Sequence, residues 1–141
     1  MINAMTSSAL LNGEIKLYVK NIMRPILGIN DLCRGIEAIV NCKEDKRGLY
    51  NLASFNKTAE QIAYEVSNTL DIPVVEYETD PTQVKNTKLQ TKTYDFSIST
   101  RKFCREFNFK FEETVESITQ GLKDNFNKII KTDRSEVIEY R

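Results

Sequence analysis

The sequence predicts an α/β fold, but only part of one. Amphipathic helical patterns alternate with short strand-like segments along the 141 residues, an order typical of α/β proteins. A self-sufficient doubly wound domain contains several Val- and Ile-rich strands buried on both faces, whereas the strand-like segments here are short and few. A chain of this length can bury one modest core. We therefore expect a single unit over residues 1–131 and a flexible tail over 132–141, where the helical pattern is lost.

The first quarter of the chain is expected to form one helix and two extended segments. Residues 2–11 read as a helix that ends at Asn12-Gly13, because glycine readily adopts the left-handed conformation that closes a helix. Residues 15–19 read as a strand. Pro25 disfavours helix over residues 23–28, so this segment is expected to be extended.

A second helix is expected to begin near Asn30 and Asp31, either of which can cap its free amides. Its apolar positions recur at helical spacing and predict a buried face, formed by Leu32, Ile36, Ile39 and Val40. A charged loop follows, and residues 49–53 then read as a short strand.

The pattern Thr58-Ala-Glu-Gln61 predicts a capping box at the start of a third helix, which Asp71 and Pro73 end. Residues 72–77 are β-branched and strand-like, whereas residues 78–93 form a long polar loop of the kind that is often functional.

The last third is expected to contain an extended segment and two helices. Residues 94–98 read as extended, and Ser99 or Thr100 can cap a short helix after them. Thr114 opens the final helix, whose apolar stripe is expected to face the core or an interface and comprises Val115, Ile118, Leu122, Phe126 and Ile129.

Composition excludes several classes of function. Lys plus Arg and Asp plus Glu each number 20, so a nucleic-acid binder that relies on net positive charge is not expected. The absence of histidine removes Ser-His-Asp and Cys-His catalysis and histidine-bound zinc, and no metal site is expected. Three unpaired cysteines, no signal-peptide pattern and no long apolar stretch predict buried thiols in a cytoplasmic protein without a membrane span.

Three stretches of the chain share a recognisable order. Residues 24–39 read Arg-Pro-Ile-Leu-Gly-Ile-Asn-Asp-Leu-Cys-Arg-Gly-Ile-Glu-Ala-Ile. Residues 48–54 read Gly-Leu-Tyr-Asn-Leu-Ala-Ser, and residues 94–103 read Tyr-Asp-Phe-Ser-Ile-Ser-Thr-Arg-Lys-Phe, ahead of Phe-Asn-Phe-Lys-Phe at 107–111. Together they resemble the C-terminal part of the NAD-dependent epimerase/dehydratase family, the extended short-chain dehydrogenases/reductases that act on nucleotide sugars. The resemblance covers residues 3–126 and implies the C-terminal portion of an extended Rossmann-type fold.

Two motifs of that family are missing. The nucleotide-binding turn Gly-x-x-Gly-x-x-Gly is absent, so no glycine-rich loop can hold a pyrophosphate at a helix N-terminus. The catalytic Tyr-x-x-x-Lys pair, in which the lysine lowers the pKa of the phenol, is absent as well, because none of the six tyrosines has Lys four residues later. We therefore expect no catalytic and no cofactor-binding residue in this chain, and NAD(P) in the rest of a longer enzyme.

The resemblance implies three substrate-binding candidates. Arg24 stands where the family has an arginine that faces the pyrophosphate of the nucleotide sugar, a target suited to the guanidinium fork; the alternative is an exposed arginine at a strand edge. Asn3 lies where some relatives place an asparagine near the sugar. Lys88 lies, with Lys85 and Lys92, in the long polar loop where the family carries Arg-x-Gly-Asp, and a solvated loop is the alternative.

Other positions that match the family's pattern are expected to be structural. Asn30, Asp31, Asn51 and Asp95 match the family's pattern but are expected to fix helix ends and loops. Four phenylalanines are expected to pack the fold, and without a coenzyme domain part of their surface would be exposed or used for self-association: Phe103, Phe107, Phe109 and Phe111.

The sequence therefore predicts the nucleotide-sugar-binding region of an NAD(P)-dependent sugar epimerase, dehydratase or reductase, inactive alone. Its expected partners are a nucleotide-diphosphate sugar and a companion Rossmann domain or chain. The alternative is a non-catalytic interaction or oligomerisation module derived from the same fold, since neutral charge and long apolar stripes also suit a homo-oligomer.

Overall fold

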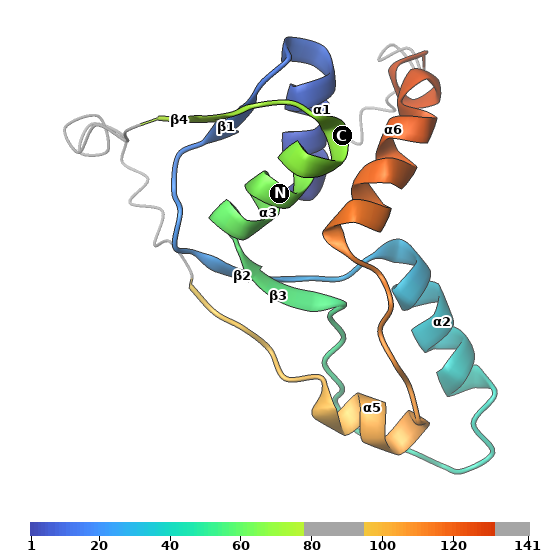
Figure 1. The fold of residues 1–141 in the computed structure, drawn as a ribbon. Coiled ribbons are helices and arrows are strands. Elements are labelled where there is room, and N and C mark those ends of the chain that lie inside the picture. Colours follow the sequence, from blue (N-terminus) through green and yellow to red (C-terminus); the bar gives the residue numbers. More distant parts are fainter. Residues whose placement is uncertain (78–94, 132–141) are drawn as a thin grey trace, which may run out of the picture.

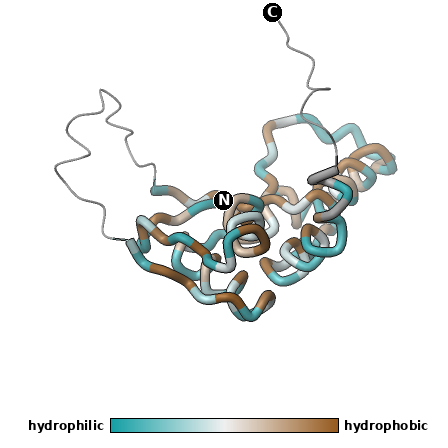
Figure 2. The backbone as a smooth tube through the Cα atoms, turned by 90° about the horizontal axis from the view of Figure 1, so that it is seen from above, coloured by the Kyte–Doolittle hydropathy of each residue, from teal (hydrophilic) through white to brown (hydrophobic). Residues whose placement is uncertain are grey.

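The computed structural model describes residues 1–77 and 95–131, and the expected tail lies outside them. In chain order its elements are α1 (Ile2–Asn12), β1 (Ile15–Leu17), β2 (Met23–Ile26), α2 (Ile29–Val40), β3 (Phe55–Thr58), α3 (Ala59–Leu70), β4 (Val74–Glu76), α5 (Arg101–Phe107) and α6 (Val115–Lys131) (Figure 1). Apolar and polar residues alternate along the helices, as amphipathic packing requires (Figure 2). The expected order of helices and strands is thus largely confirmed.

The core lies among α1, α3 and α6, which pack on one another, and α1 and α3 also pack on the strand pair β1–β4 (Figure 1). β1 and β4 are parallel, with Ile15 opposite Val74 and Leu17 opposite Glu76. The buried apolar side chains come from every one of these elements except β4 and include Ile2, Ala9, Ile15, Leu17, Ile62, Ala63, Val66 and Val115. The predicted stripe of the final helix is confirmed for Val115, which is fully buried, and for Ile118 and Leu122, which pack against this core.

The second strand pair corrects one prediction. β3 is formed by Phe55–Thr58 and pairs in antiparallel register with β2, so that Arg24 lies opposite Lys57. Residues 49–53 were expected to be a strand but have no ladder partner in the described part of the chain. Strand propensity was therefore present in that segment, but a strand also needs a neighbouring backbone to pair with.

The predicted capping box at the start of α3 is present. The Thr58 hydroxyl accepts a hydrogen bond from the Gln61 amide at 3.2 Å, and the Gln61 side-chain oxygen accepts one from the Thr58 amide at 2.9 Å. The helix ends at Asp71, whose left-handed conformation (φ 57°) closes it as expected.

Replacing Thr58 by alanine is expected to lower the free energy of unfolding by about 1 kcal/mol, because one free amide of α3 loses its acceptor. Urea denaturation measures the change. Thr69→Ala in the same helix is the matched control, since the Thr69 hydroxyl only donates to the Glu65 carbonyl. Equal losses for the two variants would contradict a capping role.

α2 and α5 lie at the end of the molecule away from β1 and β4 (Figure 1). An aromatic cluster packs at this end. Phe103 is fully buried at its centre, with ring centroids 4.7 Å from Phe107, 5.2 Å from Phe109 and 6.2 Å from Phe111. The phenylalanines therefore pack as predicted: Phe103 is fully buried, and the other three are half-buried, so part of the apolar surface of the cluster remains exposed as expected.

The exposed apolar surface belongs to α2 instead. Ile36, Ile39 and Val40, three of the four residues expected to form its buried face, are exposed. The buried residues of α2 are Asp31 and Gly35, and Leu52 packs so close to Gly35 that a Cβ there would force the Leu52 side chain to shift. Cys33 is exposed and free, which corrects the expectation of a buried thiol there.

Candidate functional site

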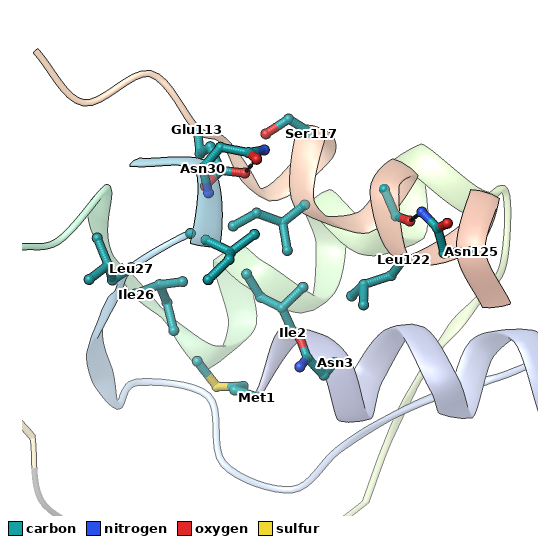
Figure 3. A pocket seen from close by; sticks show the side chains of 14 residues that line it. Met1, Ile2, Asn3, Ile26, Leu27, Asn30, Glu113, Ser117, Leu122 and Asn125 are labelled. Carbon is teal, nitrogen blue, oxygen red and sulfur yellow. Dashed lines mark hydrogen bonds between the residues drawn. The ribbon is translucent and has the colours of Figure 1, made fainter. Parts of the chain in front are cut away.

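A cavity of about 570 Å³ lies between the first turns of α1 and α2 and the side of α6 that carries Ser117, Leu122 and Asn125 (Figure 3). Its apolar walls come from Ile26, Leu27, Ile118 and Leu122, and polar side chains are placed around them. Asn3 extends from the first turn of α1 on one side, and Asn30 and Glu113 lie on the opposite side (Figure 3). Apolar walls with a few convergent polar groups are typical of a small-molecule site.

Glu113 forms the polar wall and caps α2 from a distance in sequence. Its Oε2 accepts hydrogen bonds from the backbone amides of Asn30 at 2.9 Å and Asp31 at 3.2 Å, and its Oε1 accepts one from Asn30 Nδ2 at 3.0 Å. Gly28 is at the N-cap, and a Cβ there would collide with the Glu113 carboxylate. The prediction that Asn30 or Asp31 caps α2 is therefore wrong, because neither side chain turns back onto the amides of its own helix.

Asp31 in turn binds the backbone of the segment that carries Glu113. Its carboxylate is fully buried and accepts hydrogen bonds from the backbone amides of Glu112 at 3.0 Å and Glu113 at 3.0 Å, while Arg34 Nη1 lies 2.9 Å away. Burial raises the pKa of Asp31, but hydrogen bonds from Glu113, Ser54 and Glu112 and the charge of Arg34 outweigh burial and hold it below its ordinary value of 3.8. Asp31 and Glu113 thus clamp α2 to the segment that leads into α6, and the structural role predicted for Asp31 is confirmed.

The structure places one of the three predicted substrate-binding residues, Asn3, in the lining of this cavity. Asn3 lines it, and its amide has no hydrogen-bond partner among the described residues. Arg24 does not line it, but Arg24 and Ile26 are two residues apart on β2, so their side chains leave the same face of the strand. Arg24 Nη1 donates to its neighbour's carbonyl, Met23 O, at 2.9 Å, and no described carboxylate pairs with it. Lys88, like Lys85 and Lys92, lies outside the described residues.

The carboxyl ends of β1 and β4 carry an aromatic pair that sequence reasoning missed. Tyr18 and Tyr77 follow these parallel strands, and their rings stack with centroids 5.3 Å apart while both remain exposed. Nearby, Lys20 Nζ lies 2.6 Å from Glu76 Oε2, and the hydrogen bond from Lys20 lowers the pKa of Glu76. Ligands of open α/β sheets bind at the carboxyl ends of the strands, so an aromatic residue near the end of each of the two predicted strands was the available signal.

Two tyrosines in the described segments are hydrogen-bonded to carboxylates, which raise the pKa of their hydroxyls. The Tyr50 hydroxyl donates to Glu106, and the Tyr64 hydroxyl donates to Glu76; each carboxylate raises the pKa of its tyrosine. A catalytic phenol requires the opposite shift. Among the described residues there is also no group of three His, Cys, Asp or Glu that could hold a metal ion. No helix in the described part is long and apolar enough to cross a membrane.

Comparisons with known proteins identify the fold class. No protein-family model matches the chain, and no curated protein matches it. Among solved structures, L-threonine dehydrogenase from Clostridium difficile matches with a TM-score of 0.67 at 18% identity, over 89% of this chain and 40% of that one. dTDP-glucose 4,6-dehydratase from Bacillus anthracis, in complex with NAD, matches with a TM-score of 0.64 at 18% identity, over 89% and 39% of the two chains.

UDP-glucose 4-epimerase from Bifidobacterium longum, in complex with NAD⁺ and UDP, matches with a TM-score of 0.57 at 16% identity, over 89% of this chain and 39% of that chain. The protein therefore has a small α/β fold of the extended short-chain dehydrogenase/reductase, Rossmann type. It spans about 40% of the length of the structures it matches.

Proposed function

We propose that this chain is the C-terminal, substrate-binding part of an epimerase/dehydratase-type enzyme and binds the diphosphate of a nucleotide sugar. NAD(P) and the catalytic Tyr-x-x-x-Lys pair would be supplied by a companion Rossmann domain or chain, so that these 141 residues alone are inactive. Two of the matched structures are enzymes of dTDP-glucose and UDP-glucose, and one of these contains UDP, which supports a nucleotide sugar as the ligand. The free thiols of the described cysteines suit a cytoplasmic location.

The observation that carries this proposal is the uncapped N-terminus of α1 beside the cavity. α1 has no side-chain cap and no acidic residue in its first turn, whereas the amides of α2 are occupied by Glu113. Free amides and the helix dipole attract anions. Asn3 adds an unpaired amide there, and Arg24 adds a cation with no carboxylate partner among the described residues. A diphosphate supplies the negative charge and the acceptors that these groups lack.

Arg24→Ala is expected to weaken UDP binding by about 10- to 100-fold, because a charge-assisted hydrogen bond contributes roughly 1.5–3 kcal/mol. Asn3→Ala is expected to weaken it less, since an uncharged amide is lost. Isothermal titration calorimetry with UDP measures both. Arg47→Ala is the control, because Arg47 is exposed and pairs with Asp45. Unchanged UDP affinity in Arg24→Ala would remove Arg24 from the site.

An amino acid is the second candidate ligand, because threonine dehydrogenases are among the matched structures, one with a TM-score of 0.67. An amino acid needs a carboxylate for its ammonium group. Glu113 is the carboxylate in the cavity, but its oxygens already accept three hydrogen bonds from Asn30 and Asp31, so a nucleotide sugar fits better. Titration with L-threonine separates the two candidates. No response to either ligand, with a stable dimer in sedimentation, would favour a non-catalytic oligomerisation module.

A further inference from the structure

Residues 95–98, which lie ahead of α5, are fixed to the strand pair β2–β3 by two side chains. At the end that begins beside β2, Asp95 Oδ1 accepts a hydrogen bond from the Met23 amide at 2.8 Å (Figure 1). At the other end, Asn56 of β3 binds both polar backbone groups of Ile98. Its Nδ2 donates to the Ile98 carbonyl at 3.0 Å, and its Oδ1 accepts from the Ile98 amide at 2.9 Å.

The contact at Met23 reaches Arg24, the next residue of β2. The Met23 carbonyl accepts hydrogen bonds from Arg24 Nη1 at 2.9 Å and from the Phe96 amide at 3.4 Å. Asp95 and Phe96 therefore bind the two polar backbone groups of Met23 and fix the peptide planes on either side of it. Since the Met23 carbonyl is the one partner of the Arg24 guanidinium among the described residues, its direction sets where the guanidinium lies.

A guanidinium that is held in advance binds an anion more tightly. An arginine side chain has several rotatable bonds, and ordering it on binding costs conformational entropy. The hydrogen bond to the Met23 carbonyl removes part of this freedom before a ligand arrives. It occupies Nη1 only, so Nε and Nη2 of Arg24 have no partner within the described segments and are available to phosphate oxygens.

We propose that Asp95 is a positioning residue of the anion site, which holds Met23 so that the Arg24 guanidinium meets the diphosphate already ordered. This inference rests on the proposed function. Asp95 acts as a hydrogen-bond acceptor, because its carboxylate has the Met23 amide as its one partner in the described chain. The hydrogen bond is exposed, so its loss has a small effect on the stability of the fold and a local effect on Arg24.

Asp95→Ala and Asp95→Asn form a matched pair, since both remove the charge and only asparagine keeps an oxygen for the Met23 amide. Isothermal titration calorimetry is expected to show that Asp95→Ala binds UDP about three- to tenfold more weakly than Asp95→Asn, because the ligand must then order Arg24. In the Arg24→Ala background the two substitutions are expected to give equal affinities. Equal affinities with Arg24 present, or the same difference without it, would overturn the proposal.

Two measurements on the free protein separate positioning from general damage. Asp95→Ala and Asp95→Asn are expected to unfold at the same urea concentration. The NMR signal of the Arg24 Nε–H group is expected to be the same in the wild type and Asp95→Asn and to move toward that of a free arginine in Asp95→Ala; an unmoved signal would contradict the proposal. If the signal moves but the wild type does not bind UDP, the proposed function fails while Asp95 still orders Arg24.

Discussion

Asp31→Ala is expected to lower the free energy of unfolding by about 3–5 kcal/mol, the usual cost of breaking a buried charged pair. The substitution leaves the amides of Glu112 and Glu113 without their acceptor and removes the buried partner of Arg34. It also loosens Glu113, the cap of α2. Urea denaturation followed by circular dichroism measures the loss.

Glu37→Ala is the control, because Glu37 lies on the exposed side of the same helix. A loss below about 1 kcal/mol in Asp31→Ala would show that the clamp is not a main source of stability. The stabilisation by Asp31 should also depend on pH. Since its pKa is lowered in the folded state, the contribution is fully present above the ordinary value of 3.8 and is lost as the pH falls through the folded pKa. The difference between wild type and Asp31→Ala should therefore shrink in acid.

Phe103→Ala is expected to lower the free energy of unfolding by about 3–5 kcal/mol, because it opens a cavity in a fully buried site. Phe103 lies at the centre of the aromatic cluster and also contacts the ring of Tyr50 edge-on, with centroids 6.0 Å apart. This cluster joins α5 to α2 and to the segment before α6, so its loss should expose that end of the molecule. Denaturation and limited proteolysis measure the two effects.

Phe96→Ala is the matched aromatic truncation, since Phe96 is half exposed and should cost much less. If Phe103→Ala and Phe96→Ala were equally stable, the cluster would not be the core of that end.

Local signals in the sequence were sufficient for several elements. The glycine after α1 and the Thr58–Gln61 box are recognised from a few neighbouring residues, and both are present. The cap of α2 could not be predicted, because Glu113 lies more than 80 residues away from Asn30. The same limit applies to α2, because periodicity identifies an apolar face but not whether the rest of the fold covers it, and Ile36, Ile39 and Val40 are exposed.

The candidate site was predictable only in part. Asn3 was selected through a resemblance and lines the cavity, whereas Arg24 reaches the strand face next to it. The cavity itself could not be predicted, because it forms between the starts of α1 and α2 and one side of α6, which are distant in sequence. Tyr18 and Tyr77 were missed because their stacking depends on the parallel pairing of β1 with β4.

The central claim is that this chain binds the nucleotide sugar and leaves the coenzyme to its companion. Isothermal titration calorimetry of the chain alone with UDP-glucose, dTDP-glucose and NAD tests it most directly. We predict saturable heat with at least one of the two sugars and none with NAD. Saturable binding of NAD, with no response to either nucleotide sugar, would contradict the claim.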